Sequence, residues 1–254
     1  MKTSILLAAL FAASSAFAQT TIDQARALAG NVTSGDTPGF PVTISQPGSY
    51  KLMSNLAVPA NTNGIIITAD NVTLDLNGFT LAGPGQCTQP YSSVAQPVTC
   101  TQQVGGKEGI RIVATGGGIV IRNGTVRGFG NFGIYTVNGE VLENLHVTQN
   151  GNMGITGMEN TPAGTVLVNS VVDLNGAGGV ALSGGYIERS TISSNGGFGV
   201  WGPGQVVVRN SLVQRNYGRS FEGVTVAGTM SFNNLTPRWN VKSMGGNIEN
   251  STSY

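Results

Sequence analysis

Short stretches in which apolar and polar residues alternate recur along this chain every 20 to 25 residues. Each repeat contains a short alternating strand, an Asn or Arg, a second short strand, a polar turn, and a Gly followed by Ile or Val. The repeats begin at Ile119 (IVIRNGTVRGFGNFGI), Glu140 (EVLENLHVTQNGNMGI), Thr165 (TVLVNSVVDLNGAGGV), Gly185 (GYIERSTISSNGGFGV) and Val206 (VVVRNSLVQRNYGRS). The Gly-Ile/Val steps fall at Gly64, Gly109, Gly133, Gly154, Gly179, Gly199 and Gly223. The alternation predicts three strands of about three to five residues in each repeat.

One such unit cannot bury its own apolar face, so the units must stack on one another. Stacked parallel strands joined by turns of variable length make a parallel β-helix. Unequal coil lengths argue against the left-handed form, and right-handed crossovers are the general preference. The sequence therefore predicts an all-β, right-handed parallel β-helix of about eight coils, a rod about 40 Å long at roughly 4.8 Å per coil.

Asparagines occupy two positions of the repeat. Both rows are expected to be structural, because Asn tolerates turn conformations and its amide can hydrogen-bond to an Asn one coil away. The first row is Asn123, Asn144, Asn169 and Asn210, interrupted by Arg189, and the second is Asn150, Asn175, Asn195 and Asn216.

Both ends of the stack need covering, because open strand edges invite aggregation. Ile22, Ala25, Leu28 and Ala29 have helical spacing, so residues 22–30 are predicted to form a short N-terminal capping helix. The period is lost from Phe221 onward, which predicts a C-terminal cap or tail over residues 221–254.

The composition limits the class of partner. The chain has 254 residues, a net charge of +1 and only 10% charged side chains. Proteins that bind nucleic acid need clustered Lys and Arg, so nucleic acid is not an expected partner. No segment approaches the 18 or more apolar residues of a transmembrane helix, so no membrane span is expected.

The N-terminus has the form of an export signal. Lys2 precedes an apolar run, and Ala16-Phe17-Ala18 fits a cleavage site. Residues 1–18 are therefore predicted to be a signal peptide cleaved after Ala18, leaving a single domain, 19–254, that is secreted or periplasmic.

The two cysteines, Cys87 and Cys100, suit an oxidising compartment and are expected to form a disulfide within an inserted loop, residues 86–107. Two free thiols are the alternative. A metal site is not expected here, because the chain has a single His and no further ligands lie near the cysteines.

The run from Gly39 to Gly83, which ends in DNVTLDLNGFTLAG, and the later VIRNGTVRGFG carry a resemblance over most of the chain. They resemble exported bacterial right-handed parallel β-helix repeat proteins of the pectate-lyase-like superfamily. The resemblance implies a fold and export. It implies no single activity, because that superfamily includes lyases, hydrolases, epimerases, tailspikes and members without a known role.

The motifs of the enzymatic branches are absent. Polygalacturonase-like enzymes carry Asn-Thr-Asp, Asp-Asp, Gly-His-Gly and Arg-Ile-Lys, whereas this chain has Asn160-Thr161-Pro162 and Arg111-Ile112-Val113. The Asp-Pro-His-Glu of epimerase-like members is missing as well. Pectate-lyase-like members hold Ca²⁺ with several aspartates, and the aspartates here are not expected on neighbouring coils.

One outward repeat position is charged. It is occupied by Arg122, Glu143, Val168, Glu188 and Arg209, with Asp75 near its start. The favoured interpretation is a ladder of surface ion pairs, and the alternative is a lyase-like site of arginine and carboxylate. His146 is expected to face solvent without an acidic neighbour.

A second outward position follows each Gly-Ile/Val step and carries the best candidate ligand-binding residues. Tyr135 and Trp201 would stand three coils apart, about 14 Å, with small residues between them. Their rings could stack on sugars, and Arg111 could pair with a uronate or sulfate. The loop 86–107 would form one wall. The alternative is that Tyr135 and Trp201 pack under loops or form an oligomer contact. The full row is predicted as Ile66, Arg111, Tyr135, Thr156, Ala181, Trp201 and Thr225.

Three functional hypotheses follow. The favoured one is an exported, non-catalytic module that binds polysaccharide or serves a surface role, with no cofactor. The second is an atypical polysaccharide lyase or related enzyme that uses Arg111, Arg122 and Glu143, with Ca²⁺ as an added cofactor. The third is a structural rod within an assembly.

Overall fold

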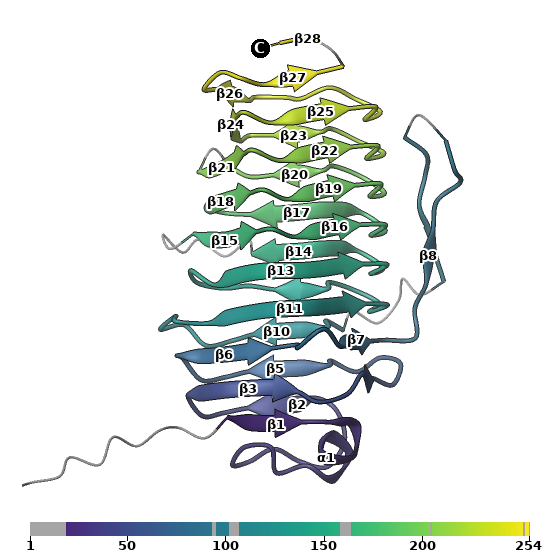
Figure 1. Cartoon of the computed structure of the whole chain (residues 1–254). Helices are drawn as coiled ribbons and strands as arrows, with labels where there is room; N and C mark the ends of the chain where they lie inside the picture. The colour runs from purple at the N-terminus through teal and green to yellow at the C-terminus, as the bar shows by residue number, and fades with distance from the viewer. Residues whose placement is uncertain are drawn as a thin grey trace, which may run out of the picture.

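The computed structural model describes residues 19–92, 95–101, 107–157, 164–203, 205–250 and 252–253. These residues form a right-handed parallel β-helix, as the sequence predicts, whose coils stack from the N-terminus to the C-terminus (Figure 1). The expected signal peptide, residues 1–18, lies outside the described residues. No helix in the described part of the chain is long and apolar enough to cross a lipid bilayer.

The strands stack in three columns. An 18-stranded sheet supplies two of them, because β11 (Val120–Arg127) and β13 (Val141–Thr148) are long enough to pass from one column into the next. The first column otherwise contains β1 (Thr20–Ile22), β3 (Gly48–Leu52), β6 (Val72–Asp75), β15 (Thr165–Val168), β18 (Gly185–Glu188), β21 (Val206–Arg209), β24 (Thr225–Ala227) and β26 (Lys242–Ser243). The second contains β4 (Leu56–Ala57), β7 (Thr80–Ala82), β16 (Val171–Asp173), β19 (Thr191–Ser193), β22 (Leu212–Gln214), β25 (Met230–Phe232), β27 (Ile248–Glu249) and β28 (Thr252–Ser253).

The third column is an eight-stranded parallel sheet, which agrees with the expected number of coils. Its strands are β2 (Val42–Ile44), β5 (Ile65–Ile67), β10 (Ile110–Ile112), β12 (Ile134–Tyr135), β14 (Met153–Gly157), β17 (Gly178–Leu182), β20 (Val200–Trp201) and β23 (Phe221–Glu222).

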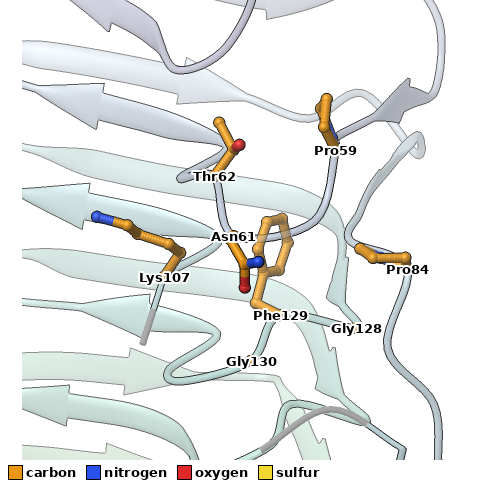
Figure 2. A pocket seen from close by; sticks show the side chains of 8 residues that line it. All are labelled: Pro59, Asn61, Thr62, Pro84, Lys107, Gly128, Phe129 and Gly130. Carbon is orange, nitrogen blue, oxygen red and sulfur yellow. The ribbon is translucent and has the colours of Figure 1, made fainter. Parts of the chain in front are cut away.

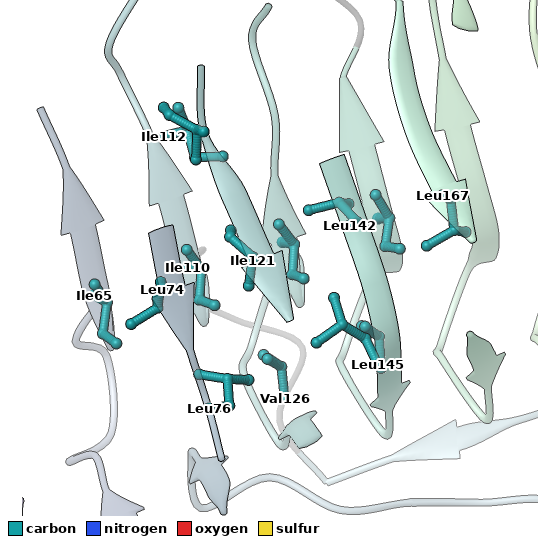
Figure 3. Close-up of a cluster of buried hydrophobic side chains, with 14 of the residues drawn as sticks. Ile65, Leu74, Leu76, Ile110, Ile112, Ile121, Val126, Leu142, Leu145 and Leu167 are labelled. Atoms are coloured by element: carbon teal, nitrogen blue, oxygen red, sulfur yellow. The ribbon is translucent and has the colours of Figure 1, made fainter. Parts of the chain in front are cut away.

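The core lies between the columns and consists of stacked aliphatic rows (Figure 3). Each strand sends alternate residues inward, so Leu74, Ile121 and Leu142 lie one above another and are fully buried. Full burial of one such side chain stabilises the fold by about 1.5–3 kcal/mol. The glycine of the Gly-Ile/Val step is needed because there is no space for a side chain at this position. An added Cβ at Gly154 would overlap the side chain of Val172 and the carbonyl of Gly179.

Both asparagine rows are structural, as predicted. Asn123, Asn144, Asn169, Arg189 and Asn210 all adopt positive φ, from 48° to 60°, between the first and second columns. The other row is completely buried and forms a chain of amide hydrogen bonds: Asn150 Nδ2 donates to Asn175 Oδ1 (3.0 Å), Asn175 Nδ2 to Asn195 Oδ1 (2.9 Å), and Asn195 Nδ2 to Asn216 Oδ1 (2.9 Å).

A short helix covers the N-terminal end, as expected, but it differs in detail. Helix α1 (Gln24–Ala29) begins after Asp23, whose carboxylate accepts a hydrogen bond from the Arg26 backbone N–H. Ile22 belongs to β1 instead. Leu28 is exposed, and Ala27 is the helix residue that packs against the coil.

The C-terminal segment departs from the sequence-based expectation. Parallel stacking continues past Phe221 through β24, β25, β26 and β27, and β28 closes the end by pairing antiparallel with β27. The step that matches Gly199-Val200 is Ser220-Phe221, since Val200 pairs with Phe221. Gly223 has φ 67° and is a turn residue. The prediction that Thr225 follows Trp201 was therefore wrong, because Thr225 lies in the first column and Glu222 holds that place.

Cys87 and Cys100 form the expected disulfide. They join β8 (Cys87–Thr88) to β9 (Thr99–Cys100) in an antiparallel hairpin that stands beside the stack (Figure 1). The hairpin lies along the corner that precedes the third column, because Cys87 Sγ is 3.6 Å from the Asn150 carbonyl and Ala95 N–H donates to the Asn233 carbonyl. Two parts of the loop 86–107, residues 93–94 and 102–106, lie outside the described residues.

Candidate functional site

The outer face of the third column carries the predicted row of ligand-binding residues. Arg111 pairs with Tyr135, Tyr135 with Thr156, Thr156 with Ala181, and Ala181 with Trp201, so the register of this row is as predicted. The row continues through Glu222 to Trp239. We call these residues the outer row.

A second row lies beside the outer row and was missed by the sequence analysis. Its members directly precede the glycine of each step, or Ser220 in the last one. Phe198 lies over Gly178, where an added Cβ would meet the phenyl ring at 2.6 Å. The signal was present in the repeats, which read GNFGI, GNMGI and GGFGV. We call this the adjacent row, and its members are Glu108, Phe132, Met153, Gly178, Phe198 and Arg219.

The N-terminal end of this face is a cluster of two charged and two aromatic residues. Arg111 Nη1 lies 3.4 Å from Glu108 Oε1, and its guanidinium stands 5.0 Å from the centre of the Tyr135 ring. Phe132 stacks on Tyr135 at 6.1 Å. Glu108 is buried and also accepts a hydrogen bond from Asn131 Nδ2 (3.1 Å). The buried carboxylate therefore fixes the orientation of the half-exposed Arg111.

The C-terminal end repeats this composition with the charges exchanged. Arg219 Nη1 lies 3.0 Å from Glu222 Oε2, and its guanidinium stands 5.3 Å from the Trp239 ring. Trp239 is 55% exposed, and Trp201 lies partly exposed beside Glu222. Sequence reasoning missed Trp239, because the period had been judged to end before it.

The middle of the face differs from the expectation. Thr156 and Ala181 were predicted to point outward between Tyr135 and Trp201, yet both are buried, at 2% and 1% exposure. A ligand here would therefore rest on the larger side chains of both rows, Phe132, Met153 and Phe198 included, which are partly exposed.

The charged column is located on the first column of strands, as predicted. Arg122 bridges Asp75 (3.2 Å) and Glu143 (3.8 Å), and Glu188 pairs with Arg209 (3.2 Å). Each such surface pair contributes about 0–1 kcal/mol.

The structure does not gather the three candidate catalytic residues. Arg111 points outward from β10, whereas Arg122 and Glu143 point outward from β11 and β13 in another column. Ile110 and Ile121, which neighbour the two arginines in sequence, are buried in the core between these columns. Arg111 therefore lies on a different face from Arg122 and Glu143.

His146 was predicted to have no acidic neighbour, and this was wrong. Its Nε2 lies 2.9 Å from Asp173 Oδ1 on the next coil. This hydrogen bond raises the pKa of His146 above its usual value, against the opposing effect of partial burial. The repeat pairs His146 with Val171, and the contact is made diagonally by Asp173, two residues after Val171 on the same strand.

The described residues of these rows include no candidate metal site. No group of three or more His, Cys, Asp or Glu side chains could hold a metal ion there. A small pocket at the turn beside Phe129 has a volume of only about 10 Å³ (Figure 2). That is about the space of one water molecule, so the pocket cannot hold a sugar.

Comparison with known proteins shows low similarity throughout. No protein-family model matches the chain, and no curated protein matches it. Among solved structures, it is similar to the Dettilon tailspike protein gp208, with 15% identity over 82% of this chain and 52% of that one, and a TM-score of 0.48. This chain thus spans about half the length of that tailspike.

Two further solved structures are similar to this chain at lower scores. The A-module of the mannuronan C-5 epimerase AlgE4 from Azotobacter vinelandii is 14% identical over 92% of this chain and 71% of its own, with a TM-score of 0.40. An alginate lyase from Paenibacillus sp. str. FPU-7 is 13% identical over 91% and 92%, with a TM-score of 0.39.

Proposed function

We propose that this protein is an exported, non-catalytic module that binds polysaccharide along the outer face of its third column. The observation that carries the proposal is the pair of parallel rows on that face. Together they provide partly exposed aromatic and methionine side chains over several coils. Flat aromatic rings suit the apolar faces of sugars, and a row of them suits a polymer.

The charged pairs at both ends of the face support a glycan that carries acidic groups. Arg111 and Glu222 are five coils apart in register, about 24 Å, so the face is long enough for several sugar rings. Arg111 is half exposed and positioned by Glu108. Its remaining N–H groups are suited to a uronate or sulfate.

The absence of enzymatic motifs supports a binding role. No Gly-His-Gly, Asp-Asp or Asp-Pro-His-Glu occurs in the sequence. Arg122 and Glu143, which were considered for a lyase site, lie together on a different face from Arg111. The disulfide and the N-terminal pattern at residues 1–18 support export through a signal peptide cleaved after Ala18.

The proposal is tested by replacing Trp201 and Tyr135 with alanine, singly. Each variant is expected to bind uronate-containing polysaccharide about tenfold more weakly in calorimetry, which corresponds to about 1.4 kcal/mol for the loss of one stacked ring. The melting temperature should change little, because both rings lie outside the core.

The matched control is Tyr186→Ala, which removes an equally large ring from the first column, where it is 39% exposed. It should leave affinity unchanged. Equal affinity in all three variants would contradict the proposed site. Unsaturated products or new reducing ends from any polysaccharide would instead show an enzyme. Concentration-dependent dimers that disappear in Trp201→Ala would show an assembly contact.

A further inference from the structure

A second hollow lies on a different face of the molecule, over the second column. Its volume is about 350 Å³, within the range of about 300–1,000 Å³ typical of small-ligand sites. It is open to solvent beside the capping helix and is lined by Gln24, Asn55, Leu56, Ala57, Thr80, Ala82 and Arg127.

The hollow exists because small residues occupy its floor. Ala57 pairs with Ala82, and Ala82 pairs with Arg127 on the next coil, so the three form one outward row. The row continues through Thr148 to Asp173. The two small alanine side chains leave a depression in the surface, and the guanidinium of Arg127 lies at its edge.

Polar groups surround this floor. Gln24 is held in place because its amide both accepts from the Ala57 N–H (2.8 Å) and donates to the Ala57 carbonyl (3.3 Å). Asn55 Oδ1 accepts from the Thr80 N–H (2.9 Å). Asn55 Nδ2 and the Thr80 hydroxyl have no hydrogen-bond partner in the described part of the chain. They are therefore available to the hydroxyl groups of a ligand.

Arg127 differs from the arginines of the ion-pair ladder. Its one polar side-chain contact among the described residues is with Gln149 Oε1, at a long 3.5 Å. Arg122 and Arg209, in contrast, are paired with carboxylates. A guanidinium without an acidic partner, beside a hollow of ligand size, is suited to binding a carboxylate through two parallel N–H groups.

His146 lies immediately beyond Arg127. It pairs with Thr125 on the coil of Arg127, two residues before it. In the described structure, Asp173 of β16 contacts this imidazole at 2.9 Å, and Arg127 of β11 lies diagonally across from His146 in the strand register. The histidine can therefore report on any charge that binds at Arg127.

We propose that this hollow binds a carboxylated sugar residue, with Arg127 pairing with its carboxylate and Asn55 and Thr80 bonding to its hydroxyl groups over the alanine floor. The site is separate from the face proposed above for polysaccharide, so either proposal can fail without the other.

The single histidine of the chain provides the test, because its imidazole resonances can be assigned directly in an untagged protein. The NMR titration of His146 is followed at low salt with D-galacturonate and with its uncharged methyl ester. A carboxylate bound by Arg127 places a negative charge near the imidazole and is expected to raise the His146 pKa by a few tenths of a unit. The ester should leave it unchanged.

Substitutions decide which residue is responsible. Arg127→Gln should abolish the shift and weaken galacturonate binding at least about tenfold, whereas Arg127→Lys should retain part of both. Tyr186→Ala, on the first column and outside both proposed sites, should behave like the wild type. No shift at saturating galacturonate, or a shift that survives in Arg127→Gln, would overturn the proposal. An equal response to acetate or to inorganic sulfate would also overturn it, by showing a general anion effect without recognition of the sugar.

Discussion

At the scale of single residues, asparagine has two distinct uses in this fold. In the exposed row, Asn144 serves a backbone role, since φ is 54° and its side chain makes one hydrogen bond, to Asn123. In the buried row, Asn175 makes four side-chain hydrogen bonds. Its oxygen accepts from the backbone and side chain of Asn150, and its nitrogen donates to Asn195 and to the Val147 carbonyl.

Asn175→Ala is therefore expected to be severely destabilising. Two buried donors on Asn150 would lose their acceptor, and each buried polar group left without a partner costs about 1–3 kcal/mol. We expect the free energy of unfolding to fall by roughly 3 kcal/mol or more in urea titrations monitored by circular dichroism. Asn144→Ala is the matched control and should cost at most about 1–2 kcal/mol, because alanine lacks the short polar side chain that helps asparagine to adopt left-handed backbone. Equal losses would contradict the distinction between the rows.

At the scale of secondary structure elements, the hairpin β8–β9 is an addition to the coil and not a part of it. Its disulfide closes a loop that contains none of the three columns. Its strands pair with each other and with no strand of the three columns, although the hairpin contacts the stack through Ala95 and the Asn233 carbonyl, the cysteines near the Asn150 carbonyl, and Tyr91, whose ring lies 5.7 Å from Arg215. Hairpin and coils should therefore lose structure separately.

The double variant Cys87→Ser, Cys100→Ser tests this separation. We expect rapid proteolytic cleavage between Thr88 and Thr99, while hydrogen exchange of the coil amides stays slow. The cost in global unfolding should not exceed about 3 kcal/mol, the chain-entropy value for a loop of this size. Wild-type protein treated with a reductant should behave in the same way. Loss of coil protection together with the hairpin would show that the disulfide supports the whole stack.

How far the sequence predicts the elements depends on the repeat. Where the period is regular, one aligned glycine sets the register of a coil, so the predicted register of the outer row was correct from Arg111 to Trp201, although the burial of Thr156 and Ala181 was not foreseen. Where Ser220-Phe221 replaces the Gly-Val step, the nearby Gly223 misled the alignment. The repeat also predicts which residues stack in one row, but it does not predict contacts between side chains of neighbouring rows. The contact of His146 with Asp173 is diagonal, which is why it was missed.

At the scale of the whole molecule, the protein is a stack in which each coil contacts its neighbours. Stability in such solenoids is approximately a sum of coil and interface contributions. Removing one whole coil should therefore leave a folded protein. The segment from Ser170 to Arg189 is suited to this, because Ser170 and Ser190 are equivalent in successive coils: the backbone N–H of Ser170 donates to Ser190 Oγ, and that of Ser190 donates to Ser211 Oγ. After deletion, Asn150 would meet Asn195 and the buried amide chain would re-form.

This deletion also tests whether one glycan chain contacts both ends of the proposed face. It moves Trp201 from three coils to two coils from Tyr135, from about 14 Å to about 10 Å, and leaves both side chains in place. We expect the far-ultraviolet spectrum to remain that of a β-helix and the free energy of unfolding to fall. Affinity for an acidic polysaccharide should drop about tenfold, because a bound polymer can no longer match both rings.

A double-mutant cycle that combines the coil deletion with Tyr135→Ala tests whether the two rings bind one glycan chain together. In the full-length protein this substitution should weaken binding, whereas in the deletion variant it should have little further effect, since the ring has already lost its spacing. Equal losses in both backgrounds would mean that Tyr135 and Trp201 bind independently of one another. The aromatic rows would then act as separate contacts, and their regular spacing would follow from the coil geometry alone.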